Sequence, residues 1–367
     1  MINVLVVVGG LDRGGVETLF SEIYKFINKK EFQFYFLCYE NKKYEYEEEI
    51  EKNGGVVLKI NKPNYLKLSE FVKDIKDIVK KYDIDIVHCN TYYNSSIVMY
   101  AAKKAKVKIR ITHSHNASDN RRQTLLRKIY AGISKCGIKL FSTHYAACGI
   151  DAGKALFGNK SKFKVIRNGI ELDKFKFNKE YRIKCRKELN IDEDTVLIGN
   201  VGRITEQKNP IFTVKTFYEY NKINNNSKLL MIGTGDLECK VKEMCKELKI
   251  EDKVLLLGSR SDVYALYSAM DIFLFPSLYE GLPITLVESQ AVGLPSLVSD
   301  TVTKEVVYTE LPEFFSLREN EKEWGKKLSN IVLNINREEC VQKNPYDIKE
   351  TTKDLEKWYK EILKRND

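Results

Sequence analysis

Short apolar runs rich in β-branched and aromatic residues alternate with amphipathic helical patterns along most of the chain. Strands that alternate with helices are typical of a parallel sheet with helices on both faces. The sequence therefore predicts an α/β protein of the doubly wound, Rossmann-like class. In the first half, the expected strands are Val4–Val8, Phe34–Cys38, Ile84–Cys89, Val107–Thr112, Ala146–Cys148 and Lys164–Ile166, and helical patterns occupy Val16–Asn28 and Leu68–Lys81.

The alternation restarts in the second half, which indicates a second domain of the same class. A length of 367 residues also suits two domains. The polar stretch Glu171–Asn190 marks the join, so we expect an N-terminal domain over 1–175, a C-terminal domain over 185–345 and a terminal helix within 346–367 that could return to the first domain. The expected elements of the second domain are Val196–Gly202, Pro210–Asn221, Leu229–Gly233, Glu238–Leu248, Val254–Leu257, Val263–Met270, Ile272–Pro276, Leu282–Val292 and Pro295–Val298.

Several classes of protein are disfavoured by composition. No apolar run approaches the roughly 18 residues of a membrane span, and Ile2–Val8 lacks the basic flank of a signal peptide, so it is expected to be a strand. The eight cysteines include no CxxC pair, which favours a reduced, cytoplasmic compartment. Four scattered histidines and no HExxH motif give no sign of a metal site.

The positive charge is concentrated in the first half. The chain carries a net charge of +10, and residues 1–175 hold 31 basic and 19 acidic residues. Within 103–139 there are eleven basic residues and one acid, Asp119. Such asymmetry indicates an acidic partner, which could be a nucleic acid, an anionic lipid surface or a phosphate-bearing substrate.

The first strand of each half ends in a loop suited to phosphate. Gly9–Thr18 contains Gly14 and Gly15 between a strand and a helix, where backbone N–H groups can approach a phosphate. A tight turn without a ligand is an equal alternative. In Gly202–Pro210, Arg203 and Lys208 stand five residues apart and could converge on a diphosphate. The alternative is a pair of solvated cations.

The segment Pro276–Glu288 carries the strongest signal. Glu280 lies in a loop with glycine and proline, and Glu288 follows eight residues later in a helix that is otherwise apolar. A carboxylate in apolar surroundings needs partners. Glu280 and the helix-start amides could hold a polyhydroxyl group, and Glu288 could accept from a diol such as ribose, although an ordinary helix glutamate is the alternative.

These three elements together resemble the retaining glycosyltransferases of family 4, which have the GT-B fold of two Rossmann-like domains facing a central cleft. Leu229–Glu238 and Asn168–Glu171 resemble further turns of that family. The run His113-Ser114-His115-Asn116 resembles its bacterial capsule and exopolysaccharide branch. The resemblance covers about residues 4 to 300.

The resemblance implies a role for each matching residue. Arg203 and Lys208 would clamp the donor diphosphate, and Gly14 and Gly15 would face the phosphates from the other domain. Glu280, with the backbone of Gly281 and Leu282, would contact the donor sugar. Glu288 would bind the ribose hydroxyls. Either His113 or His115 would approach the sugar near the reacting centre.

No metal or other cofactor is expected, because the resemblance implies that Arg203 and Lys208 replace one. Two D-x-D strings, Asp83–Asp85 and Asp192–Asp194, occur at the entries of strands. A ligand site lies at the opposite, carboxyl ends of parallel strands. Both strings are therefore interpreted as solvated turn acids.

The basic segment Arg121–Phe141 mixes cations with apolar residues at helical spacing. Arg121, Arg122, Arg127 and Lys128 could face an anionic membrane or the phosphates of a lipid-linked acceptor. The alternative is a helix with one buried face and solvated cations.

The leading hypothesis is metal-independent, retaining transfer of a hexose from a nucleoside diphosphate sugar, expected to be UDP-linked, to a lipid-linked or polysaccharide-precursor acceptor. The enzyme would work in the cytoplasm at the inner face of the plasma membrane. One alternative is a GT-B epimerase acting on a UDP-sugar. Another is a nucleic-acid-binding protein, for which no motif is present.

Overall fold

The computed structural model describes residues 1–12, 14–63, 67–116, 124–333, 335–337 and 344–365. The chain forms two compact units. One consists of Met1–Gly169 together with Tyr346–Asp367, and the other of Ile170–Pro345. Each unit has its own sheet and its own core, and each is described by itself.

The first unit is a parallel sheet of seven strands in the order β3-β2-β1-β4-β5-β6-β7. The strand order reverses between β1 and β4, which are neighbours in the sheet. Its elements are β1 Ile2–Gly9, α1 Gly15–Phe26, β2 Phe32–Cys38, α2 Glu47–Lys52, β3 Val56–Lys59, α3 Leu68–Tyr82, β4 Ile86–Cys89, the 3₁₀ turn η2 Tyr92–Asn94, α4 Ser95–Lys104, β5 Ile109–Ser114, α5 Leu125–Phe141, β6 His144–Ala147, α6 Ile150–Phe157, β7 Lys164–Val165 and α13 Ile348–Lys364.

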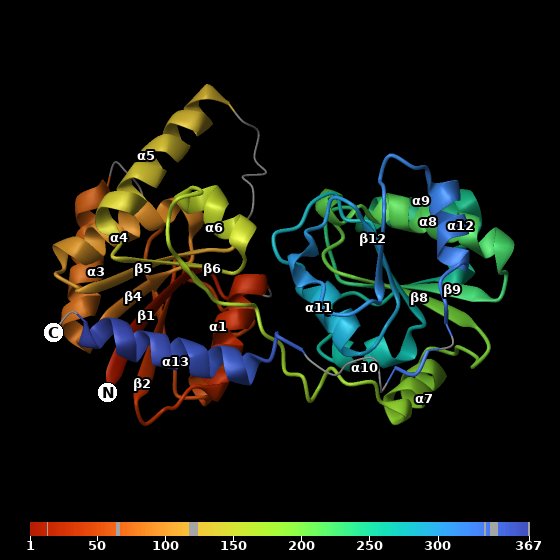
Figure 1. Ribbon diagram of the computed structural model, residues 1–367, viewed down its shortest axis with the longest axis horizontal. Coiled ribbons are helices and arrows are strands. Elements are labelled where there is room, and N and C mark those ends of the chain that lie inside the picture. Colours follow the sequence, from red (N-terminus) through yellow and green to blue (C-terminus); the bar gives the residue numbers. More distant parts are fainter. Residues whose placement is uncertain (13, 64–66, 117–123, 334, 338–343, 366–367) are drawn as a thin grey trace. The chain divides into compact units, whose positions relative to one another are not determined.

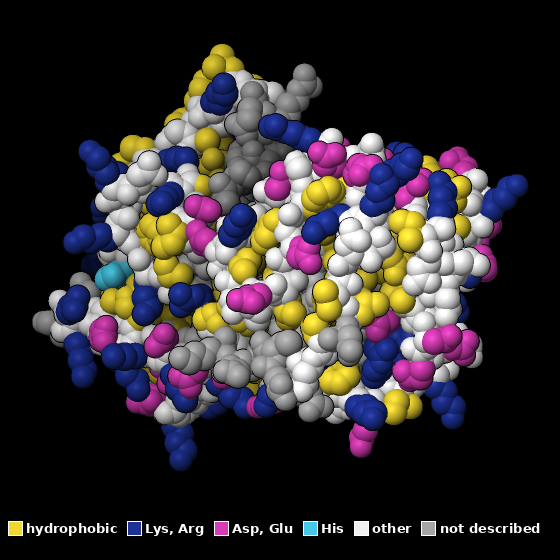
Figure 2. All heavy atoms as spheres, turned by 45° about the vertical axis from the view of Figure 1, so that its right-hand side comes forward, with side chains coloured by type: hydrophobic (Ala, Val, Ile, Leu, Met, Phe, Trp, Pro, Cys, Tyr) yellow, Lys and Arg dark blue, Asp and Glu magenta, His cyan; other side chains and the backbone are white. Residues whose placement is uncertain are grey.

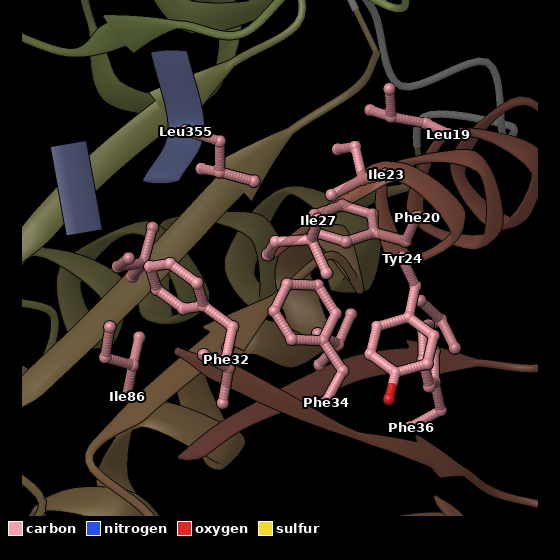
Figure 3. Packing of buried hydrophobic residues seen from close by; sticks show 14 of the residues in the cluster. Leu19, Phe20, Ile23, Tyr24, Ile27, Phe32, Phe34, Phe36, Ile86 and Leu355 are labelled. Atoms are coloured by element: carbon pink, nitrogen blue, oxygen red, sulfur yellow. The ribbon is translucent and has the colours of Figure 1, made fainter. Parts of the chain in front are cut away.

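Helices α1 and α13 pack on the same face of this sheet and share one core with it (Figure 1). Figure 3 shows how α1 places Phe20 and Tyr24 over Phe34 of β2. Helix α13 contributes Leu355, Tyr359 and Ile362, whose i, i+4, i+7 spacing puts them on one side of a helix. The C-terminal helix is therefore part of the first unit, although 176 intervening residues belong to the second.

The second unit is a parallel sheet of six strands in the order β10-β9-β8-β11-β12-β13. Here the order reverses between β8 and β11. Its elements are α7 Lys179–Glu188, β8 Val196–Val201, η3 Glu206–Lys208, α8 Pro210–Ile223, β9 Ser227–Ile232, α9 Glu238–Leu248, η4 Glu251–Lys253, β10 Val254–Leu256, α10 Val263–Ala269, β11 Ile272–Phe275, α11 Ile284–Ala291, β12 Ser296–Ser299, η5 Lys304–Val306, β13 Pro312–Phe315 and α12 Glu321–Ser329.

The predicted fold class is confirmed, because both units are parallel α/β sheets wound in two directions. The polar stretch expected to join two domains contains a helix, α7, and the chain passes from one unit to the other at Gly169 and Ile170. The sequence patterns had not indicated α4, α6, α12 or the edge strands β3 and β13. Within the described part of the chain, no helix is long and apolar enough to cross a membrane.

Candidate functional site

The loop after β8 is positioned by glycines that allow two backbones to approach closely. A Cβ atom on Gly233 would lie 2.0 Å from the carbonyl oxygen of Gly202, and one on Gly235 would lie 2.2 Å from that of Ile204. The N–H of Ile204 donates to the carbonyl of Thr234 at 2.9 Å. The turn after β9 thus packs directly against the backbone of the 202–210 loop. Only glycine, which has no side chain, allows so close an approach.

The loops after β8 and β11 are joined at the point where the strand order reverses. The N–H of Leu278 donates to the carbonyl of Gln207 at 2.9 Å. The side-chain amide of Asn209 donates to the carbonyl of Pro276 at 3.3 Å, and that of Gln207 donates to the carbonyl of Tyr279 at 3.0 Å. In doubly wound sheets this reversal point is where ligands bind. The structure therefore brings the two strongest sequence motifs together in one place.

Lys208 and Glu280 form an ion pair inside this junction. The distance between Lys208 Nζ and Glu280 Oε1 is 2.7 Å, and the two side chains are 15% and 8% exposed. Gln207 donates to the other carboxylate oxygen of Glu280 at 3.3 Å, and the ammonium group of Lys208 lies 4.6 Å from the ring centre of Phe275. The cation predicted to hold a diphosphate is thus paired with the carboxylate predicted to hold the sugar.

Glu288 lies one turn into α11 and is held by a tyrosine from α10. The hydroxyl of the buried Tyr267 donates to Glu288 Oε2 at 2.9 Å. Burial raises the pKa of Glu288 to about 7, against the opposing effects of the Tyr267 hydrogen bond and the Lys208 charge. Gly281 and Leu282, which precede this helix, are partly exposed, and Arg203 is exposed. The second unit thus holds a paired lysine and two carboxyl groups at this junction, and the exposed Arg203 stands on the loop that carries the lysine.

In the first unit, Gly14 is the N-cap of α1 and Gly15 is its first residue. The backbone of Gly14 is extended, and a Cβ atom there would lie 2.4 Å from Glu17 Oε2. An acidic side chain from the first helical turn therefore lies against Gly14, one of the two glycines expected to approach a phosphate. Their role as phosphate contacts stays a prediction.

Both candidate histidines lie in one buried cluster at the end of β5. His113 Nδ1 is 3.0 Å from Nε2 of His88, which lies on β4, and His88 Nδ1 is 2.6 Å from the hydroxyl of Tyr359 on α13. His115 is partly exposed, and its Nε2 is 2.8 Å from Asn90 Oδ1. Burial lowers the pKa of His88 and of His115 to about 3, and lowers that of His113 well below its usual value.

Helix α5 carries the described part of the basic segment, while Arg121 and Arg122 lie outside the described residues. Lys128 is exposed, and the guanidinium of Arg127 lies 5.1 Å from the ring centre of Tyr93. The apolar stripe that could have packed inward is instead at the surface: Leu125 is 75% exposed and Leu126 79%. Further exposed members of this stripe are Ile129, Ile133 and Leu140.

The two D-x-D strings lie at turns. Asp83 ends α3 in the left-handed conformation, and Asp85 accepts a hydrogen bond from the N–H of Asn3 at 2.8 Å. Asp192 precedes β8, and its carbonyl accepts from the buried guanidinium of Arg186 at 2.6 Å. No group of three metal-ligating side chains occurs among the residues that the structure describes.

Sequence reasoning did not identify His88, Gln207 or Tyr267. His88 and Tyr267 lie within buried segments whose pattern is that of an ordinary core. Gln207 lies in the Gly202–Pro210 loop, and its part in joining the two loops is visible only from its hydrogen bonds to Tyr279 and Glu280. Its position directly before Lys208 was the only signal in the sequence.

Two doubly wound parallel sheets in one chain, the second with its two motif loops joined at the reversal point, are the arrangement expected of the GT-B glycosyltransferases. The family model described as "Glycosyl transferases group 1" matches residues 182–346, and that described as "Glycosyltransferase Family 4" matches residues 13–174. The Bacillus subtilis protein named "Putative glycosyltransferase EpsF" is 32% identical over 309 residues, covering 83% of this chain and 80% of that protein. The chain belongs to glycosyltransferase family 4, as its motifs predicted.

Other similar proteins agree with this assignment. The capsular polysaccharide biosynthesis glycosyltransferase CapH of Staphylococcus aureus is 26% identical, with 98% of this chain and 99% of that protein covered. An Escherichia coli protein named UDP-Gal:alpha-D-GlcNAc-diphosphoundecaprenol alpha-1,3-galactosyltransferase is 27% identical over 65% of each chain. The crystal structure of Anabaena Alr3699/HepE in complex with UDP and glucose superposes with a TM-score of 0.81 at 15% identity, covering 98% of this chain and all of that one.

Proposed function

We propose that this protein is a retaining glycosyltransferase that transfers a hexose from a UDP-sugar to a lipid-linked saccharide during polysaccharide synthesis. The observation that carries the proposal is the junction of the second unit, where Lys208 pairs with Glu280 and stands on the same loop as the exposed Arg203. The UDP bound to the Anabaena protein and the diphosphoundecaprenol in the name of the Escherichia coli protein support the choice of donor and acceptor.

Donor binding would exchange the partner of Lys208. A diphosphate offers more negative charge than one carboxylate, and charge-assisted hydrogen bonds to it are strong. If Lys208 turns from Glu280 to the diphosphate, the Glu280 carboxylate becomes available to accept hydrogen bonds from sugar hydroxyls. One ion pair would thereby couple recognition of the phosphates to recognition of the sugar.

A front-face mechanism fits these carboxyl groups better than double displacement. Double displacement in retaining enzymes uses a pair of carboxyl groups, one as nucleophile and the other as acid and base. Here Glu280 is paired with Lys208, and Glu288 is held by Tyr267. We therefore assign the role of base to the departing diphosphate, with Arg203 and Lys208 stabilising its developing charge. No metal or cofactor is needed in this scheme.

The acceptor would be reached at a membrane surface. Helix α5 presents Lys128, together with the exposed stripe of Leu125, Leu126 and Ile129, and Arg127 lies at its edge. A helix with cations beside an exposed apolar face is suited to the boundary of an anionic bilayer. A lipid-linked acceptor would be met there, so we place the enzyme in the cytoplasm at the inner face of the plasma membrane.

The clamp is tested by the affinity for UDP. Arg203→Ala and Lys208→Ala should each weaken UDP binding by about 1.5–3 kcal/mol, since a hydrogen bond to a charged group contributes that much. Binding of uridine should change far less. Isothermal titration calorimetry measures both ligands.

Lys242→Ala is the matched control, because this α9 lysine is 61% exposed and pairs with Glu238. Equal UDP affinity in all variants would refute the clamp. Sugar transfer should also continue in EDTA. If EDTA stopped it and Mg²⁺ restored it, the acids at Asp83–Asp85 and Asp192–Asp194 would need to be considered again.

A further inference from the structure

Tyr359, His88 and His113 form a continuous hydrogen-bonded chain from the C-terminal helix to the end of β5. Its links are 2.6 Å between the Tyr359 hydroxyl and His88 Nδ1, and 3.0 Å between His88 Nε2 and His113 Nδ1. All three side chains are fully buried, and the ring of Phe20 packs edge-on against both imidazoles. We call these three residues the relay.

The proton positions along the relay follow from the partners of each group. The hydroxyl of Tyr359 donates to His88 Nδ1, because the reverse direction would leave the buried hydroxyl hydrogen without an acceptor among the described residues. His88 then carries its proton on Nε2 and donates to His113 Nδ1. His113 must therefore carry its own proton on Nε2. Burial keeps both rings neutral, since it lowers the pKa of each far below its usual value.

His115 is fixed in a complementary way. The amide of Asn90 donates to the carbonyl of Val7 at 3.3 Å, which leaves Asn90 Oδ1 to accept from His115 Nε2. His115 Nδ1 is consequently an unprotonated acceptor. Among the described residues, neither His115 Nδ1 nor His113 Nε2 has a hydrogen-bond partner. The two rings are adjacent, with centres 3.9 Å apart, so the site offers one donor and one acceptor without partners.

We propose that Tyr359 and His88 are positioning residues that hold His113 as the Nε2–H tautomer, so that His113 and His115 together bind one hydroxyl group of a sugar substrate. A hydroxyl group is the functional group of a sugar that both accepts and donates a hydrogen bond. Buried polar atoms without partners cost stability, so a ligand that satisfies both gains that amount on binding. The identity of the ligand rests on the proposed glycosyltransferase function, whereas the tautomers do not.

The tautomers are measured by two-bond ¹H–¹⁵N spectra of the full-length protein labelled with ¹⁵N-histidine. His88, His113 and His115 should each show a protonated Nε2 and an unprotonated Nδ1. Tyr359→Phe removes the hydroxyl that directs the relay, so His88 and His113 should shift toward mixed tautomers while His115 keeps its own. Tyr24→Phe is the matched control, because this buried tyrosine of the same unit bonds to Gln33 outside the relay. A protonated Nδ1 on His113 in the wild type would overturn the proposal.

The same variants separate positioning from simple stability. With UDP-glucose as donor, Tyr359→Phe should lower kcat/KM about five- to tenfold, in line with the loss of one well-placed hydrogen bond. Its affinity for UDP, for which the proposed contacts lie in the other unit, should stay unchanged. If Tyr359→Phe matches Tyr24→Phe in both tautomers and kinetics, the relay has no positioning role.

The ligand is tested with deoxy analogues of UDP-glucose. One deoxy position should weaken binding to the wild type but not to His113→Phe, since the hydroxyl and its partner are removed together. Equal effects at every position would refute the hydroxyl contact. If no UDP-sugar supports transfer but the histidine tautomers are as described, the proposed function is wrong and the relay still stands.

Discussion

At the scale of single residues, burial and a hydrogen bond act in opposite directions on Glu288. Burial raises its pKa from 4.5 to about 7, while the hydroxyl of Tyr267 and the charge of Lys208 limit the rise. A carboxyl group with a raised pKa keeps its proton in the folded state at a pH where the unfolded chain has lost it. The protonated Glu288 therefore adds to the free energy of unfolding at low pH. This contribution is lost as the pH rises from about 4.5 to about 7.

Glu288→Gln should therefore change how stability depends on pH. The amide is neutral at every pH and can still accept from Tyr267, so the variant should gain about 1–3 kcal/mol relative to the wild type between pH 5 and pH 8. Urea unfolding at several pH values measures this. Glu243→Gln, at an exposed position of α9, serves as the control. Parallel pH curves for wild type and Glu288→Gln would contradict the assignment. The proposed contact of Glu288 with the ribose hydroxyls is a separate question. It is tested by comparing the affinities of wild type and Glu288→Gln for UDP and for 2′-deoxy-UDP.

The sequence identified candidate residues that share a motif, and missed residues whose contacts are with a distant part of the chain. Arg203, Lys208, Glu280 and Glu288 were predicted because their spacing resembles that of a family. His88 could not be found in this way, since its partner Tyr359 lies 271 positions away and a histidine in a strand of buried residues has the pattern of a core residue. The contact of Glu17 with Gly14 was equally hidden, because it depends on a side-chain rotamer.

At the scale of secondary structure, α5 is held along most of its length but not at its first turn, where Leu125 and Leu126 are exposed, while Tyr130 already donates to Asn94 at 2.6 Å. A Cβ atom on Gly137 would lie 2.0 Å from Ser96 Oγ of α4, so the helix is packed tightly near its C-terminal end. Its N-terminal tip projects from the unit (Figure 1), and Figure 2 shows hydrophobic and basic side chains side by side at this tip. The sequence predicted the amphipathic pattern and left two alternatives open, an apolar side that faces a membrane and one that is buried in the unit.

Replacing two of these apolar residues should release the protein from lipid. Leu126→Glu with Ile133→Glu should abolish cosedimentation with phosphatidylglycerol vesicles and leave the melting temperature unchanged, because the two side chains are 79% and 60% exposed. Salt should weaken wild-type binding, since each basic residue near an anionic surface contributes about 1 kcal/mol. Ile223→Glu, at a 55% exposed position in the other unit, is the control. Undiminished sedimentation of the double variant would show that α5 is not the lipid contact.

Helix α4 shows why some elements were missed. Its residues Ser95–Lys104 are buried almost all round, so they show little of the one-sided pattern by which surface helices are recognised. Small residues such as Ser96 and Ala102 reflect close packing against neighbours, which a periodicity argument does not detect. The strands were easier to predict, because runs such as Val4–Val8 are buried on both faces in a parallel sheet.

At the scale of the whole molecule, the second unit is inserted into the first. The chain leaves the first unit at Gly169 and returns at Tyr346, and a Cβ atom on Gly169 would lie 2.6 Å from Ile348 Cα. The two crossing segments are thus in close contact where the chain leaves and returns. The first sheet depends on both, because α13 supplies Leu355, Tyr359 and Ile362 to its core.

Deleting residues 346–367 should therefore damage one unit and spare the other. Each large core side chain that is lost costs about 2–5 kcal/mol, and α13 carries several. Amide hydrogen exchange should show loss of protection in β1 and β2 but retained protection in β8 and β11. UDP binding should survive, since its proposed contacts Arg203 and Lys208 lie within 170–345. Protected β1 amides in the shortened chain would contradict this dependence.

The insertion also determines the order in which the two units can fold during translation. All of Ile170–Pro345 has been translated before the ribosome reaches α13, so the second unit can fold while the first still lacks a helix of its core. A chain on which α13 has not yet been translated would then lack an intact histidine cluster, because Tyr359 follows the whole second unit in the sequence. Translation of α13 is in this way the step that completes the first unit, and a product truncated before α13 would lack the hydrogen bond from Tyr359 to His88.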